Sequence, residues 1–202
     1  GPYRWRGASE ASKLGAKAVI IRSVGSAHDD FAHTGSTGFA DGVKKIPCAA
    51  LSAVDADFLH DALIKDAGLK FKMIMHCQML DSVKSYNVIA QITGTQYPDE
   101  IIVVGGHLDS WDVGEGAHDD GAGCTQSLEV LRTLKAINLQ PKRTIRCIFY
   151  MNEENGNMGG KTYGAYAKNT SKEKHIAALE SDAGGFSPRG FNIDTTFLAH
   201  KK

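Results

Sequence analysis

The sequence has no apolar run approaching the roughly 18 residues that a helix needs to cross a bilayer, so we expect no membrane span. It also has no excess charge, because 23 lysines and arginines match 23 aspartates and glutamates. A neutral chain without a basic run argues against nucleic acid as the main partner. No apolar segment follows the first basic residues, so no signal peptide is recognised and we expect a fragment cut at both ends.

Cysteine is scarce, and the four present form no CxxC pair, which argues against a structural zinc knuckle. Cys124 and Cys147 fall within apolar patterns, so we predict buried thiols rather than disulfide partners. Residues 169–171, Asn-Thr-Ser, form a glycosylation sequon. Because such triplets arise often by chance, this one favours a secretory route only mildly.

What the sequence does have is a globular composition, with 42% hydrophobic and 23% charged residues over 202 positions. The pattern of residues 1–80 predicts a helix at 8–14, a strand at 18–21, a polar loop at 25–47, a helix at 54–67 and a strand at 71–75. This part carries no catalytic cluster. A group of histidines and aspartates in its loop is interpreted as solvated rather than metal-binding: His28, Asp29, Asp30 and His33.

From about residue 81 strands alternate with helices, which predicts an α/β fold with a mixed, largely parallel sheet. Strands are predicted at 86–93, 101–104, 144–151 and 176–179, and helices around 128–137 and 161–168. In the first helix four apolar residues are spaced to share a face, namely Leu128, Leu131, Leu134 and Ile137. We expect a three-layer sandwich in which residues 81–202 form the second domain.

Three of the apolar runs end in residues of the kinds that bind metals. His107 and Asp109 follow the first run, Glu153 and Glu154 follow the second, and Asp182 follows the third. Because the carboxyl ends of parallel strands meet along one crevice, we expect these residues to converge there. Imidazole and carboxylates without a thiolate suit zinc and also accommodate cobalt or manganese.

A glycine-rich segment, residues 114–123, holds Asp119 and Asp120 just before a helix. Aspartate at a helix start often serves only as an N-cap, and the pair taken alone favours that interpretation. Beside the three strand-end clusters, however, the pair favours a metal-ligand role.

Glu153 and Glu154 are adjacent, and neighbouring side chains at a strand end point in different directions. One carboxylate can then bind a metal while the other faces a water, which suits a ligand beside a general base. Asp109, two residues after His107, is placed to accept the free ring N–H of that histidine and so fix its tautomer.

Together these motifs resemble peptidase family M28, whose members use two zinc ions. The resemblance rests on residues 106–111 (Gly-His-Leu-Asp-Ser-Trp), 119–121 (Asp-Asp-Gly), 153–156 (Glu-Glu-Asn-Gly) with Gly159 and Tyr163, and 180–184 (Glu-Ser-Asp-Ala-Gly). It covers nearly the whole chain. By this similarity residues 1–80 belong to a protease-associated insert, and residues 81–202 to the zinc-binding part of the catalytic domain.

The resemblance implies a role for each residue. His107 and Asp182 would each bind one zinc or the other, Asp119 would bridge both, Glu154 would be a ligand and Glu153 the general base. It also implies that Asp109 orients His107 and that a cis peptide follows Asp119. An exopeptidase acting on short peptides is implied, with a secreted or lysosomal location and a homodimer.

The family pattern is not fully present. Its second histidine ligand falls beyond residue 202, and His200, among lysines, is not expected to replace it. His118 occupies a non-ligand position and is interpreted as a pocket-edge side chain. A polypeptide of these residues alone is expected either to bind one zinc poorly or to fail to fold.

Other functions stay open. Some relatives of this fold have lost their metals and serve as receptors or interaction modules, but here every visible ligand is present. A single-zinc acyltransferase such as glutaminyl cyclase would lack the paired glutamates with a bridging aspartate. A dinucleotide-binding domain is less favoured, because Gly105 and Gly106 start no GxGxxG motif. Carboxypeptidase, dipeptidase and aminopeptidase specificities are not separated by the sequence.

Overall fold

The structure is a computed structural model that describes residues 2–33, 35–170, 172–182 and 184–195. The chain separates into two compact units, Gly1–Asp81 and Ser82–Lys202. No helix within the described ranges combines the length and apolarity that a bilayer crossing requires.

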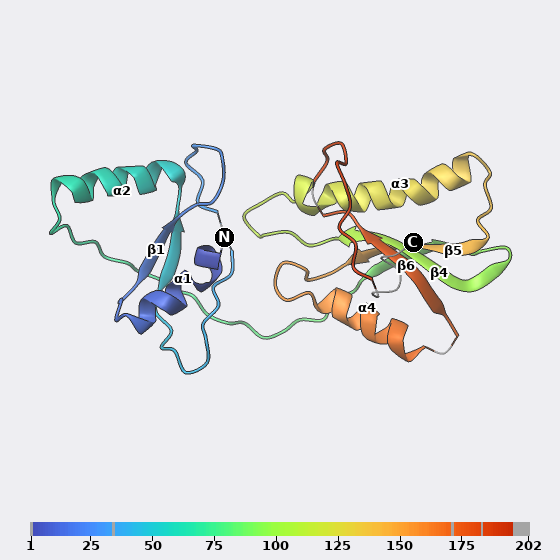
Figure 1. Cartoon of the computed structure of the whole chain (residues 1–202), viewed down its shortest axis with the longest axis horizontal. Helices are drawn as coiled ribbons and strands as arrows, with labels where there is room; N and C mark the ends of the chain where they lie inside the picture. The colour runs from blue at the N-terminus through green and yellow to red at the C-terminus, as the bar shows by residue number, and fades with distance from the viewer. Residues whose placement is uncertain (1, 34, 171, 183, 196–202) are drawn as a thin grey trace. The chain divides into compact units, whose positions relative to one another are not determined.

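The first unit contains a two-stranded parallel sheet and two helices (Figure 1). In chain order these are α1 (Pro2–Lys13), β1 (Val19–Arg22), β2 (Cys48–Leu51) and α2 (Ala53–Lys65). Helix α1 begins six residues earlier than predicted, and β2 was not predicted, because four residues carry little periodic signal. Ser52 caps α2, since its hydroxyl accepts a hydrogen bond from the backbone N–H of Asp55 at 2.9 Å.

The strand predicted at residues 71–75 is wrong, because this segment has no regular structure. Phe71, Ile74 and Met75 keep much of their surface exposed. A strand needs a hydrogen-bonded neighbour, and the described residues place none beside this segment. An apolar run predicts a strand only where the fold supplies a partner.

The second unit is built on a four-stranded sheet in the order β3-β5-β4-β6. The strands are β3 (Val88–Ile92), β4 (Tyr97–His107), β5 (Arg143–Tyr150) and β6 (Lys174–Glu180). β4 runs parallel to both β5 and β6, and β3 is antiparallel to β5. The predicted strands and the mixed, largely parallel sheet are confirmed, and the carboxyl ends of β4, β5 and β6 lie along one edge.

Helices cover both faces of this sheet. Helix α3 (Ala122–Ala136) packs on one face and α4 (Met158–Asn169) lies on the other, which gives the expected three layers (Figure 1). The core lies between the central strands and α4, and comprises Ile101, Val103, Ile148 and Tyr163. Cys124 and Cys147 are buried free thiols, as predicted.

The face that α3 turns to the sheet differs from the predicted leucine face. Its buried residues include Gly123, Cys124, Ser127 and Leu131. Leu128 is 49% exposed and Ile137 is 61% exposed. Small residues face the sheet because the helix approaches it closely: a Cβ atom on Gly123 would overlap the backbone oxygen of Ser181. The leucine spacing predicts a helix correctly, but the face of α3 that is buried is the one carrying the small residues.

A buried ionic network joins β5, α4 and the start of β6. The guanidinium of Arg146 donates to both carboxylate oxygens of Glu173 at 2.7 and 2.8 Å, to the Tyr163 hydroxyl at 3.0 Å and to Gln91 at 2.8 Å. The Tyr163 hydroxyl in turn lies 2.8 Å from Nε2 of His175, whose Nδ1 is buried without a hydrogen-bond partner. These contacts fix α4 against β6.

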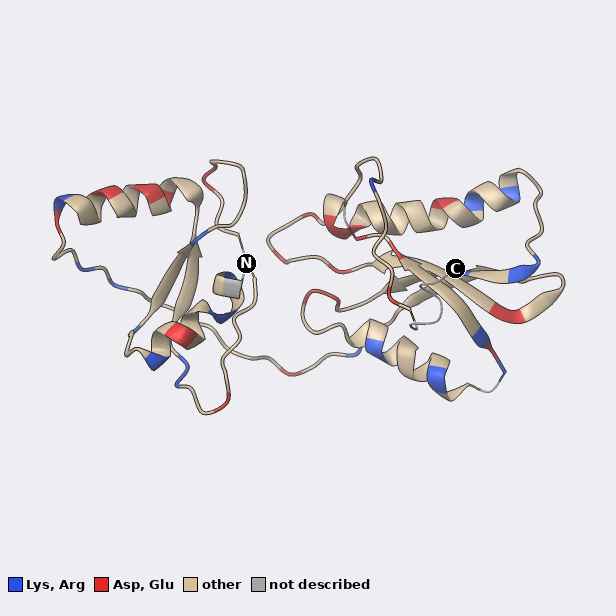
Figure 2. Ribbon diagram, viewed as in Figure 1, with Lys and Arg blue, Asp and Glu red and all other residues tan. Residues whose placement is uncertain are grey.

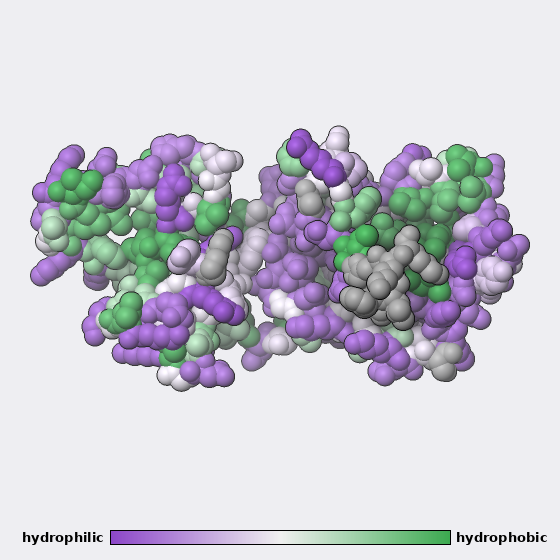
Figure 3. Space-filling view, viewed as in Figure 1, coloured by the Kyte–Doolittle hydropathy of each residue, from purple (hydrophilic) through white to green (hydrophobic). Residues whose placement is uncertain are grey.

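Apolar surface remains over β6 and over the C-terminal end of α3 on the face that Figure 3 shows. On β6 it comes from Ile176 and Leu179, and beyond α3 from Ile137 and Leu139. β6 is an edge strand among the described residues, paired only with β4.

Candidate metal centre

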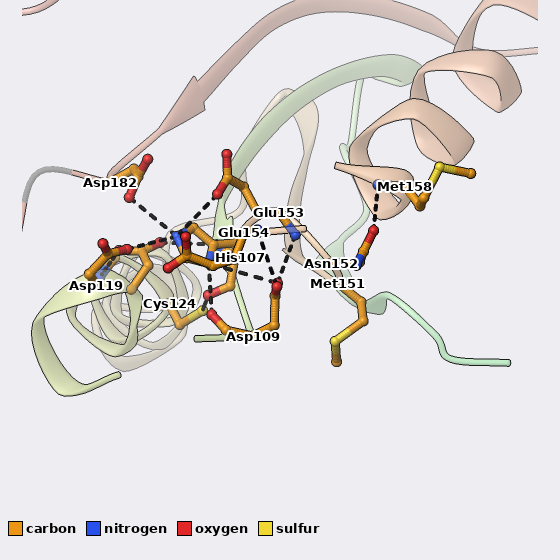
Figure 4. A network of polar contacts seen from close by, with 12 residues as sticks. His107, Asp109, Asp119, Cys124, Met151, Asn152, Glu153, Glu154, Met158 and Asp182 are labelled. Atoms are coloured by element: carbon orange, nitrogen blue, oxygen red, sulfur yellow. Dashed lines mark hydrogen bonds and ion pairs between the residues drawn. The ribbon is translucent and has the colours of Figure 1, made fainter. Parts of the chain in front are cut away.

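His107, the last residue of β4, is the centre of a group of acidic side chains. Its imidazole is 1% exposed, and Nε2 lies 3.0 Å from Asp119 Oδ1, 3.3 Å from Asp182 Oδ1 and 4.0 Å from Glu153 Oε2. Parallel pairing brings the ends of β4, β5 and β6 together, and Figure 4 shows these carboxylates around the ring. The convergence expected from the three strand ends is present in the structure.

Asp119 and Asp120 lie in the short turn η1 (Ala117–Gly121), and their side chains have different environments. Asp119 is 61% exposed and faces His107, whereas Asp120 is 1% exposed. The Asp120 carboxylate accepts hydrogen bonds from the backbone N–H groups of His107 and Gly123, each at 3.0 Å. The peptide between the two aspartates is cis, as the resemblance implied. One aspartate therefore faces the site while the other anchors the start of α3.

The sequence alone does not distinguish the structural role of Asp120 from the site-facing role of Asp119. The capping interpretation offered a signal, because the Asp120 carboxylate accepts from the N–H three residues later, in the first turn of α3. Burial raises the pKa of Asp120, and its two backbone hydrogen bonds lower it in part.

The paired glutamates lie in a turn between β5 and α4, and their side chains diverge as predicted (Figure 4). Glu153 is partly exposed beside His107. The Oε1 atom of Glu154 is buried and has no hydrogen-bond partner. Burial, followed by the neighbouring charge of Asp119, raises the pKa of Glu154. The turn also holds two asparagines with positive φ, Asn152 at 67° and Asn157 at 56°.

The predicted contact of the Asp109 carboxylate with His107 is wrong in its atoms. Nδ1 of His107 lies 2.8 Å from the backbone oxygen of Asp109, whereas the nearest carboxylate oxygen is 3.8 Å away, beyond hydrogen-bond range. The carboxylate instead accepts hydrogen bonds from the backbone N–H groups of Glu153, at 2.9 Å, and Glu154, at 3.2 Å. The main-chain bond still fixes the ring, because Nδ1 is engaged and Nε2 faces the carboxylates.

The surroundings of His107 favour a cation. Burial lowers the pKa of His107, but the bond to the Asp109 carbonyl and the charges of Asp182, Asp120 and Glu153 outweigh it and raise this pKa to about 9. Acidic residues also gather in the loops at the same end of the sheet, whereas the basic residues of α3 lie in its C-terminal half (Figure 2). This edge of the unit is thus rich in acidic residues.

The residues present fit a metal ion. Single donor atoms of His107, Asp119 and Glu154 all lie within 4.8 Å of one another, and so do those of His107, Asp120 and Asp182. The orphaned oxygen of Glu154 is explained if a cation completes its coordination, since a buried carboxylate oxygen otherwise lacks a partner. A donor set of one imidazole and several carboxylates suits zinc and related divalent ions.

His118 is exposed and does not belong to either group of candidate donors. Its ring packs edge-on against Phe186 with centroids 5.0 Å apart, and its Nδ1 lies 3.4 Å from the backbone nitrogen of Gly185. The interpretation of His118 as a pocket-edge side chain stays a prediction. His200, considered above as a substitute ligand, lies outside the described residues.

Comparisons with known proteins agree with this arrangement. Human carboxypeptidase Q is 40% identical over 191 residues, which are 95% of this chain and 40% of that protein. The crystal structure of a Peptidase M28 precursor from Shewanella amazonensis SB2B is 40% identical and superposes with a TM-score of 0.77 over 90% of this chain and 41% of its own. BSAP, a zinc aminopeptidase from Bacillus subtilis, shares the fold at 23% identity and a TM-score of 0.58, covering 87% of this chain and 40% of its own.

This chain therefore spans about 40% of the length of the carboxypeptidase Q relatives. The family model of Peptidase family M28 matches residues 87–201, more than half of the chain. That segment includes the three strand-end motifs and the paired aspartates. The chain belongs to peptidase family M28.

Proposed function

We propose that the complete protein containing this chain is a zinc-dependent exopeptidase that hydrolyses short peptides or dipeptides. His107, Asp119, Glu154 and Asp182 would hold zinc, and Glu153 would be the general base. A homodimer and a secreted or lysosomal location remain part of the proposal, as does the assignment of residues 1–80 to a protease-associated insert.

One observation carries the proposal: a nearly inaccessible imidazole presents Nε2 to carboxylates from three separate segments of the chain. Carboxylates gathered in such a small volume repel one another, and a cation held among them would relieve that repulsion. The same atoms are the preferred donors of zinc. A bound zinc ion would acidify water and polarise the scissile carbonyl.

The chain's own residues would supply proton transfer and orientation. Glu153 is partly exposed beside His107, so it can reach a water molecule, whereas the Oε1 atom of Glu154 is buried and would serve as a ligand. Its carboxylate would accept a proton from the attacking water and donate it to the departing amine, which completes addition of water across the peptide bond. The fixed ring of His107 would keep Nε2 available as a donor to the ion.

The relatives do not agree on which end of a peptide is cleaved. Several relatives are carboxypeptidase Q proteins, whereas the Bacillus fold relative is an aminopeptidase. We favour a dipeptidase or carboxypeptidase, because the 40% identity to carboxypeptidase Q extends over nearly the entire chain. We propose that a further histidine from outside these 202 residues completes the ligand set of the second ion.

The test uses the complete protein, purified without chelator. We expect bound zinc by elemental analysis and hydrolysis of unblocked dipeptides, with activity lost on chelation and restored by zinc. Slower hydrolysis after acetylation of the amino terminus would indicate that a free α-amino group is required. A protein that folds, contains no zinc and hydrolyses none of the peptides would instead be a metal-free interaction module.

A further inference from the structure

The Asp109 carboxylate lies between the end of β4 and the Glu153–Glu154 turn, and its nearest oxygen is 3.8 Å from the His107 ring, beyond hydrogen-bond range. It follows β4 directly, and both of its oxygens accept backbone hydrogen bonds from the turn that follows β5, at 2.9 Å from Glu153 and 3.2 Å from Glu154. Figure 4 shows these contacts below the acidic cluster. An ionised carboxylate that accepts two N–H groups makes stronger hydrogen bonds than a neutral acceptor does.

The remaining contacts of the turn hold its far end. Asn157 donates its backbone N–H to the carbonyls of Asn152 and Glu153, and the side-chain oxygen of Asn152 accepts from the backbone of Met158. None of these bonds engages the N–H groups of Glu153 or Glu154. For these two amides, the described part of the chain provides Asp109 as the acceptor.

We infer that Asp109 is a positioning residue that fixes the Glu153–Glu154 turn to the end of β4. Its carboxylate sets where the proposed base and ligand stand relative to His107, while its backbone carbonyl separately fixes the ring. The kinetic consequences of this inference rest on the proposed function. The structural consequence, an anchored turn, does not.

The first experiment needs neither zinc nor activity. Hydrogen–deuterium exchange is measured on the metal-free complete protein carrying Asp109→Ala or the milder Asp109→Asn. Asp112→Asn is the matched control, because Asp112 is an exposed acid in the same loop. We expect the amides of Glu153 and Glu154 to exchange about 10-fold faster or more in the Asp109 variants, with the core of β4 unchanged. Unchanged exchange in both variants would overturn the inference.

The second experiment identifies the residue through which Asp109 acts. Zinc affinity is measured for wild type, Asp109→Asn, Glu154→Gln and the double variant. If Asp109 positions the turn, its substitution weakens zinc about 10-fold in wild type but has little effect once Glu154 is already replaced. Equal losses in both backgrounds would show that Asp109 acts through His107 and would refute the inference.

The two proposals can fail separately. A wild-type protein that neither binds zinc nor hydrolyses peptides would contradict the proposed function, and the exchange experiment would still report on the turn. Turnover provides a third measurement in an active protein. Asp109→Asn should lower kcat more than it changes KM, and this loss should shrink in a Glu153→Gln background. A loss of the same size in that background would contradict positioning of the base.

Discussion

The carboxylate of Asp120 accepts a hydrogen bond from the backbone N–H of His107 at 3.0 Å. Asp120, which follows the proposed ligand Asp119, therefore anchors the proposed ligand His107. Its second oxygen accepts from Gly123, in the first turn of α3. This buried acid therefore joins the end of β4, the cis peptide and the helix start. Removal of its carboxylate should loosen all three.

Asp120→Ala should lower the free energy of unfolding by at least about 2 kcal/mol, because two buried N–H donors lose their acceptor. Urea denaturation of the complete protein measures the change, with the exposed Asp112→Ala as control. Asp120→Asn keeps one acceptor oxygen and should cost less. If Asp120→Ala were as stable as wild type and Asp112→Ala, the anchoring role of Asp120 would be wrong.

Glu153→Gln should retain zinc and lose turnover by about 10²- to 10⁴-fold, the range typical of a removed general base. The amide has the size of the acid but cannot accept the proton. Zinc content and kcat are measured on the same preparation, so that metal loss is not mistaken for loss of the base. A variant retaining most of its activity would remove Glu153 from this role.

The effect of Glu154→Gln on the free energy of unfolding should have opposite signs with and without zinc. Without zinc the substitution removes a partly buried acid whose Oε1 is buried without a hydrogen-bond partner and whose pKa burial raises, so stability should equal or exceed that of wild type. With zinc present it should fall below wild type by about 1.4 kcal/mol for each tenfold loss in affinity, once zinc exceeds both dissociation constants. Thermal unfolding with zinc and with chelator gives both comparisons. A loss of equal size in the two conditions would argue against ligation.

The ionic network centred on Arg146 should contribute strongly to the stability of the second unit. Glu173→Ala should cost about 3 kcal/mol, because it leaves a buried guanidinium without its carboxylate partner. Glu129→Ala is a suitable control, since Glu129 pairs with Arg132 on an exposed helix surface. Equal losses in the two variants, measured by urea denaturation, would contradict the buried role.

Protonation of His175 should lower the free energy of unfolding as the pH falls. Burial and the charge of Arg146 lower its pKa below 6.5, although Glu173 opposes them in part. Below about pH 6.5 the unfolded chain therefore binds more protons at this residue than the folded chain, so the free energy of unfolding decreases as pH falls. His175→Gln should remove this part of the slope and His60→Gln, at an exposed position, should not. Parallel pH profiles for wild type and His175→Gln would refute the assignment.

Strand ends were predictable from the sequence, and partner atoms were not. Apolar runs ending in His107, Glu153 and Asp182 indicated where the strands stop, and parallel topology then brought the ends together. The acceptor of the His107 ring N–H was not predictable, because Asp109 offers two acceptors at one chain position, its backbone oxygen and its carboxylate. Which of them is used depends on where the turn after β5 places its amides.

The same limit explains the errors elsewhere in the chain. Residues 71–75 carry an apolar pattern but lack a strand to pair with in the described structure. On α3 the leucine spacing was correct for a helix, yet Gly123 and Ser127 face the sheet. Local sequence sets the type of an element, whereas its neighbours decide its pairing and its buried face.

The missing side chain of Gly123 has a consequence for the width of the metal centre. Because even one methyl group there would strike the backbone oxygen of Ser181, the gap between α3 and the end of β6 is as narrow as the backbone permits. Asp182 follows Ser181 directly, so its distance from His107 depends on the width of that gap. A change in how α3 packs would therefore alter the size of the proposed cation site while the residues proposed to hold the ion stayed the same.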